Sequence, residues 1–203
     1  GEATGSGGEV FPNVVTRTIT DEEIERMQYV YCGLDWGFSV DPFAFIRLSY
    51  DRKTDTIYLI DELYQKNCST ARIAELIKEK GYHISGRISP GGVMYSPYAE
   101  QQTIFADAAE PKSIADLRGA GLKIYPCKKY PGSVIYGIRW LQNRKIVIDP
   151  KRTPHAWKEF TEYEYLTTKD GEFLADVPDE CNHLIDSCRY ALDRLIITRG
   201  VSA

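Results

Sequence analysis

The sequence predicts an α/β fold built on one mixed sheet, with three antiparallel strands first, parallel strands after them, and helices on both faces. Three strand-like segments rich in aromatic and β-branched residues follow one another between residues 29 and 64, joined by short polar turns. From about residue 69 onward, helical and strand-like patterns alternate, which is typical of strands paired through helical crossovers. The 203 residues, 43% of them hydrophobic, suffice for one domain with a substantial core.

The antiparallel strands are expected at residues 29–35, 42–50 and 56–64. Their connections are too short for a crossover, so consecutive strands should pair antiparallel. The residues that precede them begin with a Gly- and Ser-rich stretch. Residues 1–28 are therefore expected to be a linker or interdomain tail, and residues 29–203 to form the folded domain.

The alternating part starts with a helix that is capped by Ser69 or Thr70 and ends at Gly81. Three strand and helix pairs are expected next, with strands at 103–109, 122–127 and 145–150 and helices at 111–121, 133–143 and 153–163, the last capped by Thr153. A final helix is expected from about Glu180 to Ile197.

Two segments are expected to depart from this alternation. Residues 84–99 contain three glycines and two prolines, which predict a long surface loop or a short hairpin before the fourth strand. Residues 169–171 read "KDG" and predict the turn of a hairpin just upstream of the last helix.

Composition narrows the class of protein. The chain has no run of about 18 apolar residues and no secretory signal pattern, so a soluble intracellular protein without a membrane span is expected. The five cysteines form no CxxC pair, which argues against a disulfide framework or a ribbon-type zinc site.

The charge is unevenly distributed along the chain. The net charge is −4, yet residues 111–152 carry ten Lys and Arg against two Asp, which leaves a net charge of −12 on the remainder. This asymmetry is compatible with a polyanion-binding surface and equally with an ordinary solvated one.

Three carboxylates and a histidine form the candidate site. Asp35 and Asp107 each end a predicted strand, and ligands of open α/β sheets collect at such carboxyl ends. In the last helix, His183 and Asp186 are three residues apart, so they are neighbours on the helix surface. They lie on a different face from the apolar stripe of Leu184, Cys188, Leu192 and Leu195.

Carboxylate oxygens suit Mg²⁺ or Mn²⁺, and two such ions would support hydrolysis of a phosphodiester. The three carboxylates should also repel one another, which predicts that the pKa of at least one is raised. Taken singly, each aspartate is more often a turn, cap or solvated residue. A zinc site from Cys181, His183 and Cys188 is a minor alternative, because Cys188 belongs to the apolar stripe.

Three motifs carry a family resemblance: "GLDWGFSVDPFAF", "FADAAEPKSIADLR" and "CNHLIDSCRYALDRL". In this order they resemble the C-terminal nuclease domain of the large terminase subunit of tailed bacteriophages, which has an RNase H-like fold. The resemblance runs from about Gly33 to Ile196. It implies metal-binding catalytic roles for three residues and an accessory role for a fourth: Asp35, Asp107 and Asp186, with His183. It further implies residues that support these groups or contact DNA, namely Glu110, Lys112, Lys128 and Lys129.

The resemblance implies an endonuclease that cuts concatemeric double-stranded viral DNA during packaging, at the procapsid portal vertex in the host cytoplasm. The implied partners are double-stranded DNA, an N-terminal packaging ATPase domain of the same protein, the portal protein and the small terminase subunit. This chain lacks a GxxxxGK[ST] loop and is not expected to hydrolyse ATP itself. The hairpin at residues 169–171 is a candidate gate for the duplex. The alternatives are a Holliday-junction resolvase, transposase or ribonuclease H, and a non-catalytic docking module.

Overall fold

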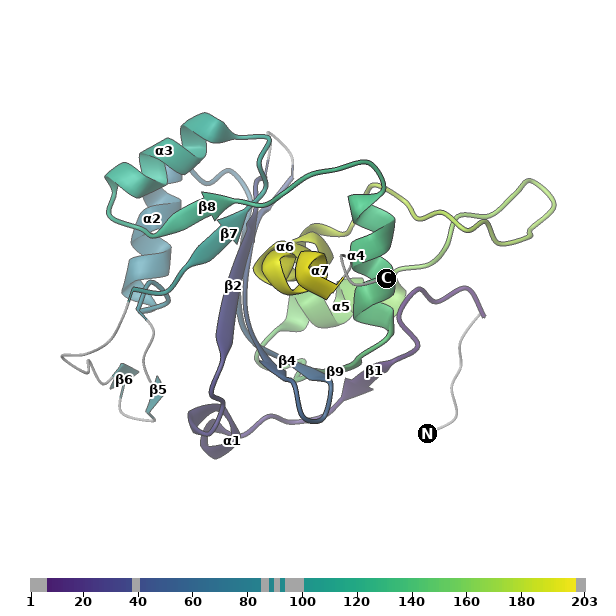
Figure 1. The fold of residues 1–203 in the computed structure, drawn as a ribbon, viewed down its shortest axis with the longest axis horizontal. Helices are drawn as coiled ribbons and strands as arrows, with labels where there is room; N and C mark the ends of the chain where they lie inside the picture. The colour runs from purple at the N-terminus through teal and green to yellow at the C-terminus, as the bar shows by residue number, and fades with distance from the viewer. Residues whose placement is uncertain (1–6, 38–40, 85–87, 90–91, 94–100, 200–203) are drawn as a thin grey trace.

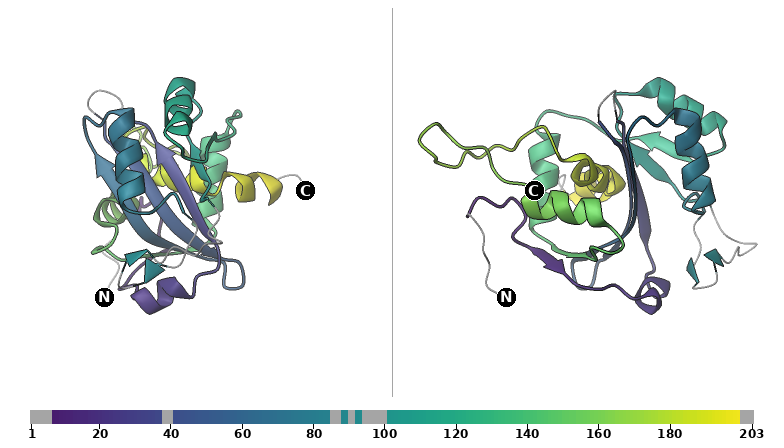
Figure 2. Two further views of the ribbon diagram at one scale, coloured as in Figure 1. Left: turned by 90° about the vertical axis from the view of Figure 1, so that its left-hand side faces the viewer. Right: turned by 180° about the vertical axis from the view of Figure 1, so that it is seen from behind.

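A seven-stranded mixed sheet runs through the centre of the molecule (Figure 1). The computed structural model describes residues 7–37, 41–84, 88–89, 92–93 and 101–199. Two layers of helices enclose the sheet, one on each face, as the two further views show (Figure 2). Within the described residues, no helix has the length and apolar character needed to cross a membrane.

The strand order confirms the predicted mixture of antiparallel and parallel pairing. Across the sheet the order is β1-β9-β4-β3-β2-β7-β8. The three consecutive strands β2, β3 and β4 pair antiparallel, and every other neighbouring pair is parallel. The bounds are β1 (Val14–Thr16), β2 (Val30–Asp35), β3 (Phe43–Asp51), β4 (Thr56–Gln65), β7 (Ile104–Ala106), β8 (Ile124–Pro126) and β9 (Lys145–Ile148).

The helices divide between the two faces, as predicted. The bounds are α1 (Asp21–Glu25), α2 (Thr70–Glu79), α3 (Pro111–Gly119), α4 (Ser133–Gln142), α5 (Pro154–Glu162), α6 (His183–Ala191) and α7 (Asp193–Arg199). Helices α2 and α3 pack on one face, whereas α4, α5, α6 and α7 contribute to the core on the other. The single last helix predicted from Glu180 to Ile197 is two helices, because the chain leaves helical geometry at Leu192.

The segment before β2 is part of the fold from residue 7 onward, which corrects the expectation that residues 1–28 form a linker for all but residues 1–6, which lie outside the described residues. Strand β1 pairs in parallel with β9 at the edge of the sheet, and α1 follows it. Val10 and Phe11 are almost completely buried in the core. The backbone N–H of Val10 donates to the carbonyl oxygen of Tyr163 at 2.9 Å. Apolar residues scattered through this short segment therefore anchor it to the domain.

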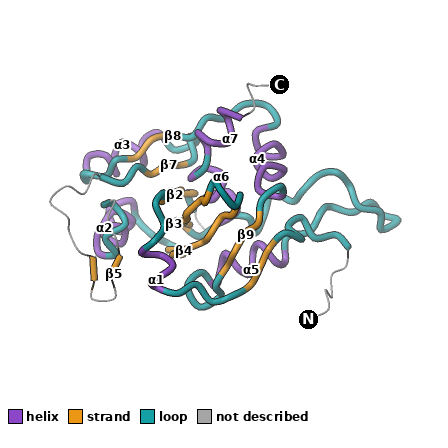
Figure 3. Tube along the Cα trace, turned by 60° about the horizontal axis from the view of Figure 1, so that its bottom comes forward, coloured by secondary structure: helices purple, strands orange, loops and turns teal. Residues whose placement is uncertain are grey.

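Of the two irregular segments, the first is described only in part and the second completely. Strands β5 (Ile88–Ser89) and β6 (Gly92–Val93) pair antiparallel, which agrees with the short-hairpin alternative, while residues 85–87, 90–91 and 94–100 lie outside the described residues. The second hairpin is confirmed, since the N–H of Thr168 donates to the carbonyl oxygen of Glu172 at 2.8 Å. Figure 3 shows the connection between α5 and α6 as a long excursion away from the sheet.

Candidate functional site

Asp35 and Asp107 leave the sheet side by side. Asp35 is the last residue of β2 and Asp107 directly follows β7, its parallel neighbour. The backbone N–H of Asp107 extends this pairing by donating to the carbonyl oxygen of Leu34 at 3.1 Å. The indole N–H of Trp36 donates to the carbonyl oxygen of Asp107 at 2.8 Å. These bonds hold the backbone of both residues at the carboxyl ends of neighbouring strands, as the sequence predicts.

Helix α6 lies directly on β2 because Gly33 has no side chain. A β-carbon at Gly33 would lie 1.8 Å from the carbonyl oxygen of Ser187, a distance that no real contact allows. The Ser187 hydroxyl also donates to the carbonyl oxygen of Ala44 in β3 at 3.0 Å. This close seating brings His183 and Asp186 above the strand ends.

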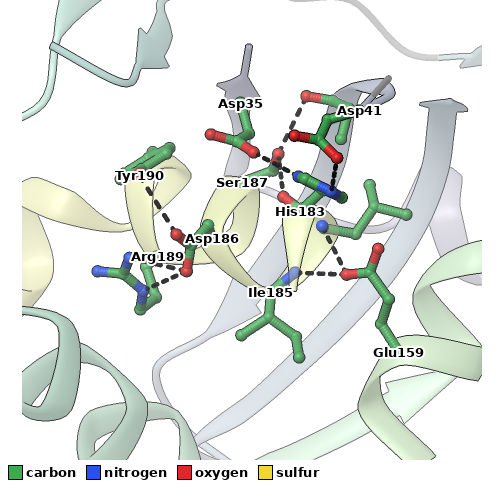
Figure 4. A network of polar contacts seen from close by, with 11 residues as sticks. Asp35, Asp41, Glu159, His183, Ile185, Asp186, Ser187, Arg189 and Tyr190 are labelled. Carbon is green, nitrogen blue, oxygen red and sulfur yellow. Dashed lines mark hydrogen bonds and ion pairs between the residues drawn. The ribbon is translucent and has the colours of Figure 1, made fainter. Parts of the chain in front are cut away.

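The N-terminus of α6 is held by a carboxylate from α5. Glu159 Oε2 accepts from the backbone N–H groups of Leu184 (2.7 Å) and Ile185 (3.2 Å), as Figure 4 shows. Asn182, at the N-cap position, makes no side-chain capping bond. Burial raises the pKa of Glu159 to about 8, although these two hydrogen bonds act in the opposite direction.

The N-terminus of α5 is held in the same way by a carboxylate from β4. Glu62 accepts from the backbone N–H groups of His155 (3.0 Å) and Ala156 (2.9 Å). Thr153 occupies the N-cap position, as predicted, but its side chain makes no capping bond. The cap comes from a strand about ninety residues earlier in the chain, a partner that local sequence cannot reveal.

A cleft of about 410 Å³ opens between the strand ends and α6. The four residues predicted to act in catalysis all line it, namely Asp35, Asp107, His183 and Asp186. Lys128 and Lys129, from the loop between β8 and α4, line it as well. Glu110 and Lys112 are not among the described lining residues: Glu110 starts α3 and accepts from the Ser113 hydroxyl at 3.2 Å, and Lys112 is exposed.

The three predicted carboxylates of the cleft each have a basic side chain as partner, while Asp179 and Asp193 line the cleft as well. The pairs are Asp35 Oδ2 with His183 Nδ1 (3.0 Å), Asp107 Oδ1 with Lys129 Nζ (2.5 Å) and Asp186 Oδ1 with the Arg189 guanidinium (2.8 Å). Figure 4 shows the first and the last of these, each made by a residue of α6. The cleft is therefore a set of separate ion pairs around a shared space.

Neighbouring carboxylates help to raise the pKa values of Asp35 and Asp186. Burial raises the pKa of Asp35 to about 6, and the charges on Asp186 and Asp107 add to the rise. The pKa of Asp186 is raised as well, chiefly by burial. Asp35 in turn raises the pKa of His183 through their hydrogen bond. The predicted rise is thus confirmed, with desolvation as a larger cause than repulsion.

The donor set fits a hard divalent cation. Asp35, Asp107 and Asp186 converge on one cleft, and the raised pKa values of Asp35 and Asp186 mean that added positive charge would stabilise their ionised forms. Over the described part of the chain, no three His, Cys, Asp or Glu side chains stand close enough together to enclose an ion. The carboxylates would therefore exchange their present cationic partners for the ion. Zinc from Cys181, His183 and Cys188 is not supported, because Cys188 is fully buried in the core while Cys181 is exposed.

Two further residues of α6 line the cleft, Arg189 and Tyr190, for which no role is predicted from the sequence. Arg189 pairs with Asp186, and the Tyr190 hydroxyl lies 3.4 Å from the same carboxylate. Their spacing of three and four residues from Asp186 would have predicted these contacts on a helix. The hairpin around residues 168–172 lies outside the described lining of the cleft, and the expected gate is not seen in this arrangement.

Comparison with known proteins agrees with the fold and the motifs. The chain is 39% identical over 207 residues to the large subunit of terminase from Bacillus phage SPP1, a match of 100% of this chain and 45% of that protein. It is 28% identical over 162 residues to the PBSX phage terminase large subunit of Bacillus subtilis (strain 168), a match of 79% of this chain and 33% of that protein. The chain therefore spans less than half the length of these curated relatives.

Among solved structures, the crystal structure of the SPP1 large terminase nuclease domain with bound Mn is similar, with a TM-score of 0.77 and 37% identity. The match covers 91% of this chain and 97% of that one. The family model for the terminase RNAseH like domain matches residues 35–194, from the end of β2 to the start of α7. On this match, which takes in most of the chain, the protein belongs to the terminase RNase H-like domain family.

Proposed function

We propose that this chain is a metal-dependent endonuclease domain that cleaves concatemeric double-stranded viral DNA during packaging into capsids. The observation that carries the proposal is the convergence of Asp35, Asp107, Asp186 and His183 on one cleft. Membership of the terminase family and the similarity to a nuclease domain with bound Mn support it.

The proposed cofactor is Mg²⁺ or Mn²⁺, with two ions held by Asp35, Asp107 and Asp186. Such ions, when bound, lower the pKa of water and stabilise negative charge on a phosphate. The remaining groups come from the chain. Asp35 orients the His183 imidazole through Nδ1 and favours its protonated form. Lys129 places positive charge on the wall of the cleft, where a phosphate of the substrate would lie.

The proposed partners follow from the same family. Double-stranded DNA is the substrate, and a packaging ATPase domain on the N-terminal side of the same protein would move it. The portal protein and the small terminase subunit would position the complex at the portal vertex. Because phosphate contacts carry no base information, the domain alone should bind DNA with little sequence preference and with strong salt dependence.

The test is nicking and linearisation of supercoiled plasmid by the purified chain in EDTA, Mg²⁺ or Mn²⁺. Wild type is compared with Asp107→Asn and Asp186→Asn, which keep the side-chain volume and remove the charge. Asp116→Asn is the matched control, because Asp116 is an exposed carboxylate on α3. We expect metal-dependent cutting that both cleft variants reduce to the EDTA background and that the control leaves unchanged.

Cutting that survives in both cleft variants would refute the assignment of the site. Absence of cutting by a folded wild type in every metal, together with retained binding of portal protein, would favour the docking alternative. Equal cutting of a Holliday junction or an RNA/DNA hybrid, measured beside linear duplex, would favour one of the other RNase H-like classes.

A further inference from the structure

We propose that a groove over β7 and β8, beside the carboxylate cleft, binds the sugar–phosphate backbone of the DNA that flanks the bond to be cut. This inference rests on the proposed function and extends it by naming the surface that holds the substrate. The groove has a volume of about 490 Å³ and is separate from the cleft. Helices α2 and α3 pack on the opposite face of β7 and β8.

The lining of the groove is cationic and aromatic. Lys123 and Arg194 supply the positive charge, and Phe105 and Tyr125 supply the rings. Among its described lining residues there is no Asp or Glu, although acidic residues outnumber basic ones in the chain. Tyr125 is 41% exposed, so this surface is open to a ligand. Positive charge in a lining without carboxylates complements a polyanion.

The groove and the cleft lie next to each other along the same strands. Phe105 precedes Asp107 by two residues, and Tyr125 precedes Cys127, which lines the cleft, by two residues as well. Side chains two apart on a strand share a face and are separated by about 7 Å. Gly33, the register partner of Phe105, faces α6, which identifies this face as the one that carries the carboxylates.

Two arginines are held in place over the rings. The Arg194 guanidinium lies 5.1 Å from the centroid of Phe105, and the Arg118 guanidinium lies 5.2 Å from that of Tyr125. Arg118 Nε also donates to the carbonyl oxygen of Ile124 at 2.7 Å. An arginine stacked on a ring has less freedom to lose, and its planar fork matches phosphate. Phe105 and Tyr125 are therefore positioning residues in this proposal.

Duplex DNA is the occupant that fits these observations together. An acidic peptide would also complement the charge, but the groove lies beside the site where a phosphodiester is proposed to be cut. An unpaired strand would need free ring faces for its bases, whereas the guanidiniums already lie over these rings. Lys128 and Lys129 continue the positive charge from the end of β8 into the cleft.

The test is fluorescence anisotropy of a labelled 30-base-pair duplex in EDTA, which measures binding without cleavage. Lys123→Gln and Arg194→Gln are each expected to weaken binding about 3- to 10-fold and to lower the salt slope by about one. Arg52→Gln is the matched control, since Arg52 stacks on Tyr29 at 5.5 Å in another groove, which Glu23 and Asp51 also line. Its binding and salt slope should equal those of wild type.

The positioning role has its own readout. Phe105→Leu should weaken duplex binding, whereas Phe105→Tyr should restore it, because a tyrosine ring still supports the guanidinium. If Phe105→Leu fails to fold, duplex binding by Lys123→Gln still tests the proposal, because Lys123 is exposed. Unchanged binding and salt slope in both charge variants would overturn the proposal, and so would weakened binding of single strands with duplex binding intact. If the chain binds duplex DNA normally but cuts no substrate in any metal, the proposed nuclease function is refuted and the proposed DNA-binding groove is not.

Discussion

Gly33→Ala tests whether the seating of α6 on β2 builds the cleft. The substitution adds one methyl group at a position where the strand backbone and the helix backbone already touch. It changes no charge and no residue that lines the cleft. We therefore expect any loss of activity to come from displacement of the helix that carries His183 and Asp186.

The magnitude follows from the contact distances. The new β-carbon would lie 1.8 Å from the Ser187 carbonyl oxygen, and ordinary contact begins at 3.4 Å, so α6 has to withdraw by the difference, about 1.6 Å. That shift breaks the hydrogen bond from Ser187 to Ala44 and loosens the packing of Leu184 and Cys188, which are fully buried. Overpacking and a broken buried hydrogen bond together cost about 2–5 kcal/mol of the free energy of unfolding.

The assay is thermal and urea unfolding of the variant beside wild type, followed by plasmid cleavage at a temperature where both are folded. For a chain of this size the melting temperature should fall by about 5–15 °C. Gly119→Ala is the matched control, because a β-carbon there meets nothing within 4 Å. It should raise stability by about 0.5–1 kcal/mol. A Gly33→Ala variant as stable and as active as wild type would refute the reasoning.

Three further predictions concern the charges around α6. Burial raises the pKa of Glu159 from an ordinary 4.5 to about 8, so its contribution to stability is complete below pH 4.5 and is lost as the pH rises toward 8. Glu159→Gln keeps an acceptor for α6 and removes the titration. Between pH 5 and 9 the melting temperature of the variant should therefore rise relative to that of wild type; a difference that does not change with pH would contradict this. Gly137→Ala places a β-carbon 2.8 Å from Arg189 Cδ and disturbs its pair with Asp186, for a loss of about 1–3 kcal/mol in urea unfolding; an unchanged midpoint would be the contrary result. Under the proposed function, Mn²⁺ at about 100 times its Kd should add about 2.7 kcal/mol of stability by calorimetry, and Asp35→Asn should lose most of that gain; an equal gain in the variant would place the metal elsewhere.

The parts of the site that the sequence predicts are those set by local periodicity. Asp35 and Asp107 were found because each ends a strand-like run, and the parallel pairing of those strands then places them together. His183 and Asp186 were found because helical spacing separates them from the apolar stripe. In each case the residues within a few positions carry the information.

The parts that were missed depend on partners far away in the chain. Strand β1 has three residues, of which Val15 and Thr16 are exposed. It is a strand because these residues pair with β9, more than 130 residues later. The cap of α5 was assigned to Thr153 because threonine is a common local cap, yet Glu62 provides it. The pairing of Lys129 with the carboxylate of Asp107 joins a loop residue to a strand end about twenty residues earlier. No local pattern distinguishes these outcomes.

The two carboxyl caps link β4 to α5 and α5 to α6, so a small displacement of α5 also displaces α6. Glu62 sets where α5 begins, and Glu159, on α5, sets where α6 begins. A tilt introduced at the β4 end would therefore reach His183 without any change in a residue of the cleft. Alignment of the reacting groups is in this sense a property of the sheet and two helices together, and mutations remote from the cleft can misalign it.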